Sequence, residues 1–202
     1  TSRCHFYCRF CFRAGQDHDP DISEVLEAID LLSTLPGLHE VILSGGDPLV
    51  LTDEALARIL TALRRLPALK TVRIHSRAPV HDPARITQQL AHTLVQSSPA
   101  PLRMAIHTSH PRELRPEFTA AISSLRAAGI GLLNQTVLLG GVNARLETLA
   151  EHFAALHALG VKPYYLHHPD RVAGTPGFRV SIEQGLALYL ALRGCIPGPA
   201  MP

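Results

Sequence analysis

The sequence lacks both the long apolar run of a membrane span and the basic tract that favours nucleic-acid binding. Its 202 residues carry a formal net charge of +2, with the two signs scattered along the chain. No apolar stretch approaches the roughly 18 residues that would read as a membrane helix. A hydrophobic content of 46% fits one medium-sized domain with its own core. We therefore expect a cytoplasmic protein with neither a membrane nor a nucleic acid as partner.

Cysteine is scarce as well, and its distribution excludes a disulfide framework. Of the four cysteines, Cys4, Cys8 and Cys11 lie within eight residues, and Cys195 lies near the other end. Such a set does not resemble the cysteine framework of a secreted domain, so we expect reduced thiols and no role for Cys195. Three crowded thiolates suit an iron–sulfur cluster or zinc. Because a structural zinc site takes four ligands, the spacing favours the cluster and leaves zinc as the alternative.

Helical periodicity and short β-rich runs alternate along the rest of the chain. Helices are expected over 22–35, 53–66, 83–97, 113–128, 145–159 and 181–193, and strands within 39–46, 70–76, 102–107, 131–139 and 162–167. This alternation predicts an α/β fold of parallel strands covered by helices, as a barrel or part-barrel, with an open doubly wound sheet as the alternative. One domain over 1–195 is the simplest division, with 196–202 as the start of a C-terminal extension.

A second motif, SGGDP, follows the first predicted strand. Its paired glycines, Gly45 and Gly46, let backbone groups approach a ligand closely. The same residues also make an ordinary turn, with Asp47 and Pro48 starting a helix. The carboxyl ends of strands are where α/β proteins place their sites, so the position favours a functional role.

Together, the C-x3-C-x2-C loop and the Gly-Gly-Asp turn resemble those of radical S-adenosylmethionine (SAM) enzymes. The stretches CRFCFR, VILSGGDPLVLTDEAL, RIHSRAPV, IHTSHP, LLNQTVLLGGVN and KPYYLHHPD occur in this order and resemble the lysine 2,3-aminomutase family. HSRAPV, LLNQTVLL and PYYLH resemble the branch that makes β-lysine for the modification of elongation factor P. The resemblance implies a partial (β/α)6-type radical SAM barrel with outer helices, whose first strand precedes residue 1.

The resemblance also implies the cofactor-binding residues. They are Cys4, Cys8 and Cys11 for a 4Fe-4S cluster, and Gly45, Gly46, Asp47, His107 and Gln135 for SAM. In the family, a donor such as flavodoxin or ferredoxin reduces the cluster, and SAM is cleaved to a 5′-deoxyadenosyl radical. The 2-amino group of lysine then moves to C3 in an adduct with pyridoxal phosphate (PLP).

For the substrate, the resemblance implies Arg13 and Asp170. Arg13 matches an arginine that binds the substrate carboxylate, a task that suits the planar guanidinium. Asp170 matches an acid that holds the distant ammonium of lysine, which makes lysine the expected substrate and glutamate or arginine the alternative. Arg9 is assigned to the PLP phosphate and His167 to the PLP ring. Ser76 and Arg77 also follow a strand, where capping of the next helix is the competing interpretation.

The sequence departs from the family in having only two lysines, Lys70 and Lys162. Each opens a predicted strand, whereas a lysine that carries PLP would lie among the catalytic groups at the opposite end. We therefore expect the PLP lysine beyond Pro202, in a longer enzyme. The alternatives are a radical SAM enzyme without PLP and a non-catalytic zinc or iron–sulfur module. A homo-oligomer is compatible with the sequence but not indicated by it.

Overall fold

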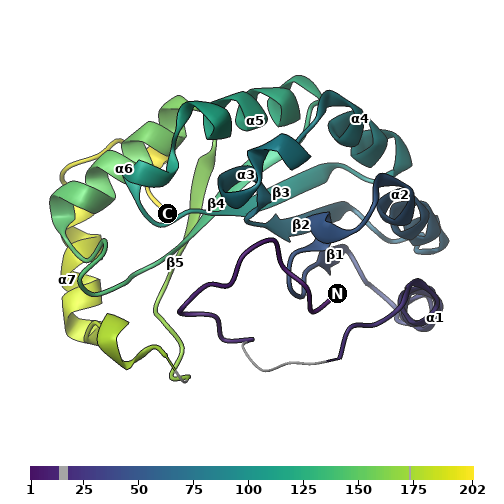
Figure 1. Ribbon diagram of the computed structural model, residues 1–202, viewed down its shortest axis with the longest axis horizontal. Helices are drawn as coiled ribbons and strands as arrows, with labels where there is room; N and C mark the ends of the chain where they lie inside the picture. Colours follow the sequence, from purple (N-terminus) through teal and green to yellow (C-terminus); the bar gives the residue numbers. More distant parts are fainter. Residues whose placement is uncertain (14–17, 173) are drawn as a thin grey trace.

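The computed structural model describes residues 1–13, 18–172 and 174–202. Its centre is a curved sheet of five parallel strands in sequence order (Figure 1). The strands are β1 (Glu40–Leu43), β2 (Thr71–Ser76), β3 (Leu102–His107), β4 (Gly131–Val137) and β5 (Lys162–His167). A doubly wound sheet would reverse its strand order at a switch point, and this sheet does not. The part-barrel prediction is confirmed, and the doubly wound alternative is wrong.

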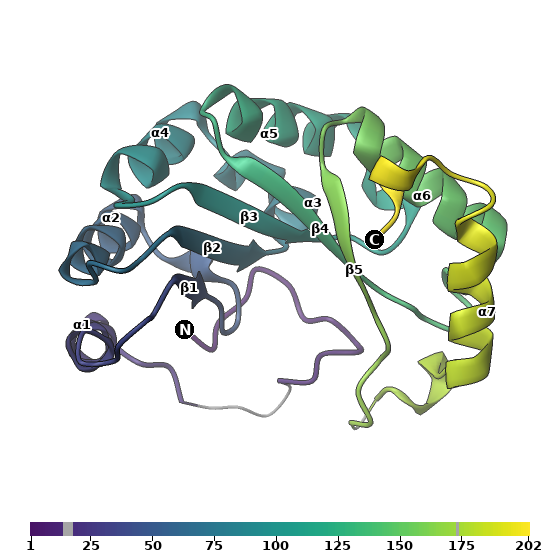
Figure 2. The same cartoon turned by 180° about the vertical axis from the view of Figure 1, so that it is seen from behind.

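Seven α-helices lie in the described residues, and most of them form an arc outside the sheet (Figures 1 and 2). They are α1 (Ile22–Leu32), α2 (Asp53–Ala62), α3 (Ala78–His81), α4 (Gln88–Ser97), α5 (Pro116–Ala127), α6 (Leu146–Ala158) and α7 (Ile182–Leu192). Side-chain caps fix several starts: Thr52, Thr87 and Ser181 each accept a backbone N–H of the first turn. Such caps satisfy donors that the helix itself leaves free.

Two predicted helices begin later than the periodicity indicated. The segments Pro83–Arg85 and Pro111–Glu113 form 3-10 turns, so that α4 begins at Gln88 and α5 at Pro116. Proline has no N–H and is tolerated only in the first turn of a helix, which sets the start of α5. The short helix α3 was not predicted.

The hydrophobic core lies between the convex face of the sheet and the outer helices. In β3, Met104 and Ile106 are fully buried in this core, and they pack in the same layer as Phe118 of α5. Because side chains alternate along a strand, Arg103 and His107 point to the concave face instead. The concave face therefore carries polar side chains at these positions, on the side opposite to the hydrophobic core.

The carboxyl ends of all five strands lie at one edge because every pairing is parallel. The register aligns His107 of β3 with Gln135 of β4, and Gln135 with Tyr165 of β5. A register shift between Asn134 and Gln135 accompanies this pairing. Two residues predicted to contact SAM thus lie side by side on neighbouring strands.

Residues 1–13 run across the concave side of the sheet (Figures 1 and 2). At the β1 end, the N–H groups of Gly46 and Asp47 donate to the carbonyl oxygens of Thr1 and Arg3, at 2.6 and 2.7 Å. Farther along the segment, the guanidinium carbon of Arg9 lies 5.2 Å from the centre of the Phe178 ring, in the region after β5. This segment carries the three crowded thiols. It therefore connects the β1 end of the curved sheet with the region after β5.

Residues 196–202 pack back onto the domain. The Lys162 ammonium donates to the carbonyl oxygens of Pro199 and Met201, at 3.0 and 2.6 Å, and Ala200 is fully buried. That these residues begin an extension stays a prediction. Across the described ranges, every helix is too short or too polar to traverse a bilayer.

Candidate functional site

The three crowded thiols are free and partly buried, whereas Cys195 is exposed. Burial raises the pKa of the Cys4 thiol to about 11, with further increases from Asp47, Cys11 and Cys8. The three sulfurs therefore lie close enough to interact electrostatically. Within the part of the chain that the structure describes, no three His, Cys, Asp or Glu side chains converge as ligands of one ion would. The donor set is made of thiols alone, which suits an iron–sulfur cluster, and zinc stays the alternative.

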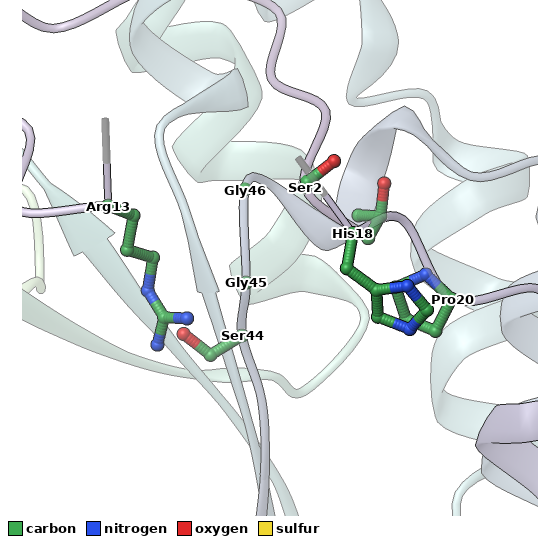
Figure 3. A pocket seen from close by; sticks show the side chains of 8 residues that line it. Ser2, Arg13, His18, Pro20, Ser44, Gly45 and Gly46 are labelled. Carbon is green, nitrogen blue, oxygen red and sulfur yellow. The ribbon is translucent and has the colours of Figure 1, made fainter. Parts of the chain in front are cut away.

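The glycine turn after β1 lines a hollow of about 230 Å³ (Figure 3). Gly45 has a φ of +131°, a backbone conformation that residues with a Cβ rarely adopt, and a Cβ on Gly46 would overlap the backbone of Arg3. Arg13 forms part of the opposite wall and extends its guanidinium toward Ser44. The remaining lining residues are Thr1, Ser2, His18 and Pro20. The turn thus exposes backbone beside a cationic side chain.

Asp47 points away from this hollow. Its carboxylate is 5% exposed and accepts hydrogen bonds from the Ser76 hydroxyl at 2.8 Å and from the N–H groups of Arg77, Ala78 and Leu49 at 2.8, 3.1 and 3.0 Å. The carboxylate therefore joins the end of β1 to the end of β2. The part of the motif that lines the hollow is the pair of glycines, whereas Asp47 is not among the lining residues, and its contact with SAM stays a prediction.

Arg77, which follows β2, reaches the cysteine loop. Its Nη1 donates to the sulfur of Cys8 at 2.7 Å, its Nη2 to Glu113 at 2.6 Å and its Nε to the carbonyl oxygen of His107 at 3.3 Å. Capping of α3 does not explain these contacts, because the side chain makes no capping bond there. The sequence left the role of Arg77 open, and Glu113 was missed because its partner is 36 residues away.

His107 and Gln135, both assigned to SAM, lie on the concave face beside the cysteine loop. The His107 ring is 5.5 Å from the ring of Phe10, and its Nε2 is 3.4 Å from the Ser109 hydroxyl. Burial, reinforced by Arg77, holds the pKa of His107 well below its usual value. A neutral imidazole there can both donate and accept hydrogen bonds.

The residues assigned to substrate and PLP lie around the same concave face. Asp170 is exposed after β5, and its charge raises the pKa of His167, although burial lowers that pKa overall. The pKa of His75 is lowered to about 4 by burial, then by Arg73, with smaller contributions from His167 and Arg13. Asp170 does not line the hollow beside Arg13.

The two lysines do not fit a PLP site. Lys162 is the first residue of β5 and bonds the carbonyl oxygens of Pro199 and Met201. Lys70 is exposed and precedes β2. Both lie at the amino end of the sheet, opposite to the thiols, so neither can serve groups at the carboxyl edge. The expectation that a PLP lysine lies elsewhere stays a prediction.

A curved parallel sheet with a three-cysteine loop at its carboxyl edge defines a class of protein. A profile of the radical SAM superfamily matches residues 1–153, and the chain belongs to this superfamily. Solved structures agree on the fold: anSMEcpe with bound AdoMet gives a TM-score of 0.72 at 12% identity, over 96% of this chain and 57% of that one. Methylornithine synthase gives a TM-score of 0.63 at 17% identity, over 95% and 59%.

Within the superfamily, the chain is similar to L-lysine 2,3-aminomutases. It is 38% identical to that of Clostridium subterminale over 100% of this chain and 49% of the relative. It is 37% identical to that of Escherichia coli (strain K12) over 98% and 59%. The chain thus spans about half the length of the curated relatives it matches. The resemblance predicted from the motifs is confirmed at this level, and the branch that serves elongation factor P is not distinguished.

Proposed function

We propose that this chain is the SAM-cleaving core of an aminomutase that moves the 2-amino group of lysine to C3. The observation that carries the proposal is the arrangement of the site: the glycine turn after β1 and Arg13 line one hollow, and the segment with the three free thiols is bonded to Arg77 at the end of β2. The similarity to L-lysine 2,3-aminomutases supports it, since it extends over the whole chain. The scarcity and spacing of the cysteines, which do not form a disulfide framework, favour a cytoplasmic location.

In this proposal each side chain has a binding task. Cys4, Cys8 and Cys11 hold a 4Fe-4S cluster, which when bound and reduced supplies the electron that cleaves SAM to a 5′-deoxyadenosyl radical. Neutral His107 and the Gln135 amide, neighbours in the sheet register, offer hydrogen bonds to SAM, and the glycine turn forms one wall of the adjoining hollow. An electron donor of the flavodoxin or ferredoxin kind is required as a partner.

For the substrate, Arg13 binds the carboxylate with its two-pronged guanidinium, and Asp170 attracts the side-chain ammonium. This charge pattern favours lysine over glutamate. The proposal includes PLP on the expectation that a lysine outside this sequence binds it. Arg9 and His167 are then its candidate contacts.

Anaerobic reconstitution of the full-length protein tests the superfamily chemistry. We expect iron and sulfide to be incorporated and, after reduction, SAM to be cleaved to 5′-deoxyadenosine. Cys8→Ala should abolish cleavage, because three thiolates are needed to hold the cluster. Cys195→Ala is the matched control and should cleave SAM normally, since that thiol is exposed and distant in sequence. Zinc without iron in an anaerobic preparation that cleaves no SAM would instead support a binding module.

The substrate is tested separately on the same full-length preparation. We expect β-lysine from L-lysine, with little product from glutamate or arginine. SAM cleavage without any aminomutase product, in a protein supplied with PLP, would favour the alternative of a PLP-free radical SAM enzyme. Transfer of the product to elongation factor P distinguishes the branch suggested by the sequence motifs from free lysine metabolism.

A further inference from the structure

Arg77 is the charged side chain that joins the cysteine loop to the strands. Its Nη1 lies 2.7 Å from the sulfur of Cys8, 69 residues away in sequence. The side chain is 14% exposed, and its guanidinium carbon is 5.5 Å from the centre of the Phe10 ring. The positive charge of this nearly buried guanidinium acts strongly on the thiol of Cys8, because solvent screens it poorly there.

The guanidinium is held in place by groups other than the cysteine. Glu113 accepts from Nη2 at 2.6 Å, and the carbonyl oxygen of His107 accepts from Nε at 3.3 Å. Glu113 is the last residue of the 3-10 turn before α5, and its carboxylate accepts the N–H groups of Ser109 and His110, which precede that turn. The orientation of Arg77 toward the cysteine loop is therefore built into β2, β3 and the Glu113 turn.

Hydrogen bonds to cysteine sulfur and nearby charge are established determinants of iron–sulfur reduction potentials. A donor and a positive charge at a ligand sulfur stabilise the reduced cluster, which carries one more negative charge. Glu113 contacts Arg77 rather than the sulfur of Cys8. Its negative charge partly offsets the effect of the Arg77 charge on the cluster. Arg77 therefore raises the reduction potential of the cluster, and Glu113 lowers it.

We propose that Arg77 is a positioning residue that hydrogen-bonds the Cys8 ligand sulfur and raises the reduction potential of the cluster, with Glu113 moderating its effect. This inference rests on the cluster of the proposed function and adds how the same chain sets the ease of its reduction. It assigns a role to a residue that the cofactor-binding motifs leave out.

The test is a redox titration of the SAM-free, anaerobically reconstituted full-length protein with dithionite, followed by electron paramagnetic resonance of the reduced cluster. In Arg77→Met we expect the equilibrium constant for reduction to fall about tenfold, which for a one-electron couple lowers the midpoint by about 59 mV. The g-values should also shift. Arg103→Met is the matched control, because Arg103 is also an arginine of the sheet region but is exposed and lies at the amino end of β3, opposite to the cysteine loop.

Glu113→Gln gives a second, opposite readout. Removing the carboxylate charge should raise the midpoint, whereas a role in folding alone would move both variants in one direction or neither. An unchanged or raised midpoint in Arg77→Met would overturn the inference. If Arg77→Met does not hold a cluster, Glu113→Gln decides, and an unchanged or lowered midpoint there overturns it. Failure of the unaltered protein to take up a cluster would overturn the proposed function instead.

Discussion

At the scale of single residues, Gly46 lets residues 1–3 approach the turn after β1 closely, because it has no side chain. Its N–H donates to the carbonyl oxygen of Thr1 at 2.6 Å, and a Cβ would overlap the backbone of Arg3. We expect Gly46→Ala to separate residues 1–3 from the turn and to destabilise the protein by about 1–3 kcal/mol, the usual cost of overpacking. Urea unfolding measures this change.

Gly177→Ala is the control for that substitution. Gly177 lies in a 3-10 turn with nothing within 4 Å of an added Cβ and without a positive φ, so its replacement should leave the free energy of unfolding within about 0.5 kcal/mol. Equal losses in the two variants would show that the close approach at Gly46 is not responsible. Because the turn that contains Gly46 lines the hollow, and Gly177 does not, SAM affinity should fall in Gly46→Ala but not in Gly177→Ala.

At the scale of elements, the Asp47 carboxylate holds the ends of β1 and β2 in register. It accepts hydrogen bonds from the Ser76 hydroxyl and from the N–H groups of Arg77 and Ala78. Asp47→Ala leaves these buried donors without a partner, and we expect a loss of about 1–3 kcal/mol or more in the free energy of unfolding. Asp30→Ala, which removes an exposed ion pair with Arg65, should cost less than about 1 kcal/mol. Losses of similar size would contradict the linking role.

Element type was predictable because it depends on local sequence, and element boundaries were less so. The strands over 102–107 and 162–167 were predicted with their observed bounds, since β-rich runs there end sharply at polar residues. Predicted strand 131–139 ends instead at Val137. The helix predicted over 53–66 ends at Ala62 and continues as a 3-10 turn. Hydrophobic periodicity does not distinguish these two helical forms.

The site was predictable as far as its motifs are local. The three cysteines and the glycine pair are recognised by spacing alone. The inward orientation of Asp47 and the contact between Arg77 and Cys8 depend on which strand ends become neighbours, and no spacing within one segment encodes that. The sequence therefore indicated candidate cofactor-binding residues and named Asp47, Ser76 and Arg77, but it did not indicate which contacts these three side chains make.

At the scale of the whole molecule, buried histidines make stability depend on pH. Burial, the largest cause in each case, lowers the pKa values of His75, His81 and His152 to about 4. In the folded protein these imidazoles stay neutral until the pH falls to that value, whereas in the unfolded chain they take up protons below about 6.5. The folded state is therefore penalised progressively as the pH falls from 6.5 to 4, by about 1.4 kcal/mol per pH unit for the fully buried His152 and by less for the partly buried His75 and His81, which water screens.

His152, which is not one of the proposed cofactor-binding residues, tests this dependence. It is fully buried in α6, and its Nε2 lies 3.1 Å from the Thr108 hydroxyl, whereas its Nδ1 has no partner among the described residues. We expect His152→Gln to lower stability at pH 7.5 but to reduce the slope between pH 6.5 and 4.5 by about 1.4 kcal/mol per pH unit. His157→Gln, an exposed position on the same helix, is the control. Urea titrations at several pH values measure both slopes, and comparing variants cancels the titration of the carboxylates. Parallel curves for His152→Gln and the unaltered protein would show that His152 takes up its proton equally in the folded and unfolded states.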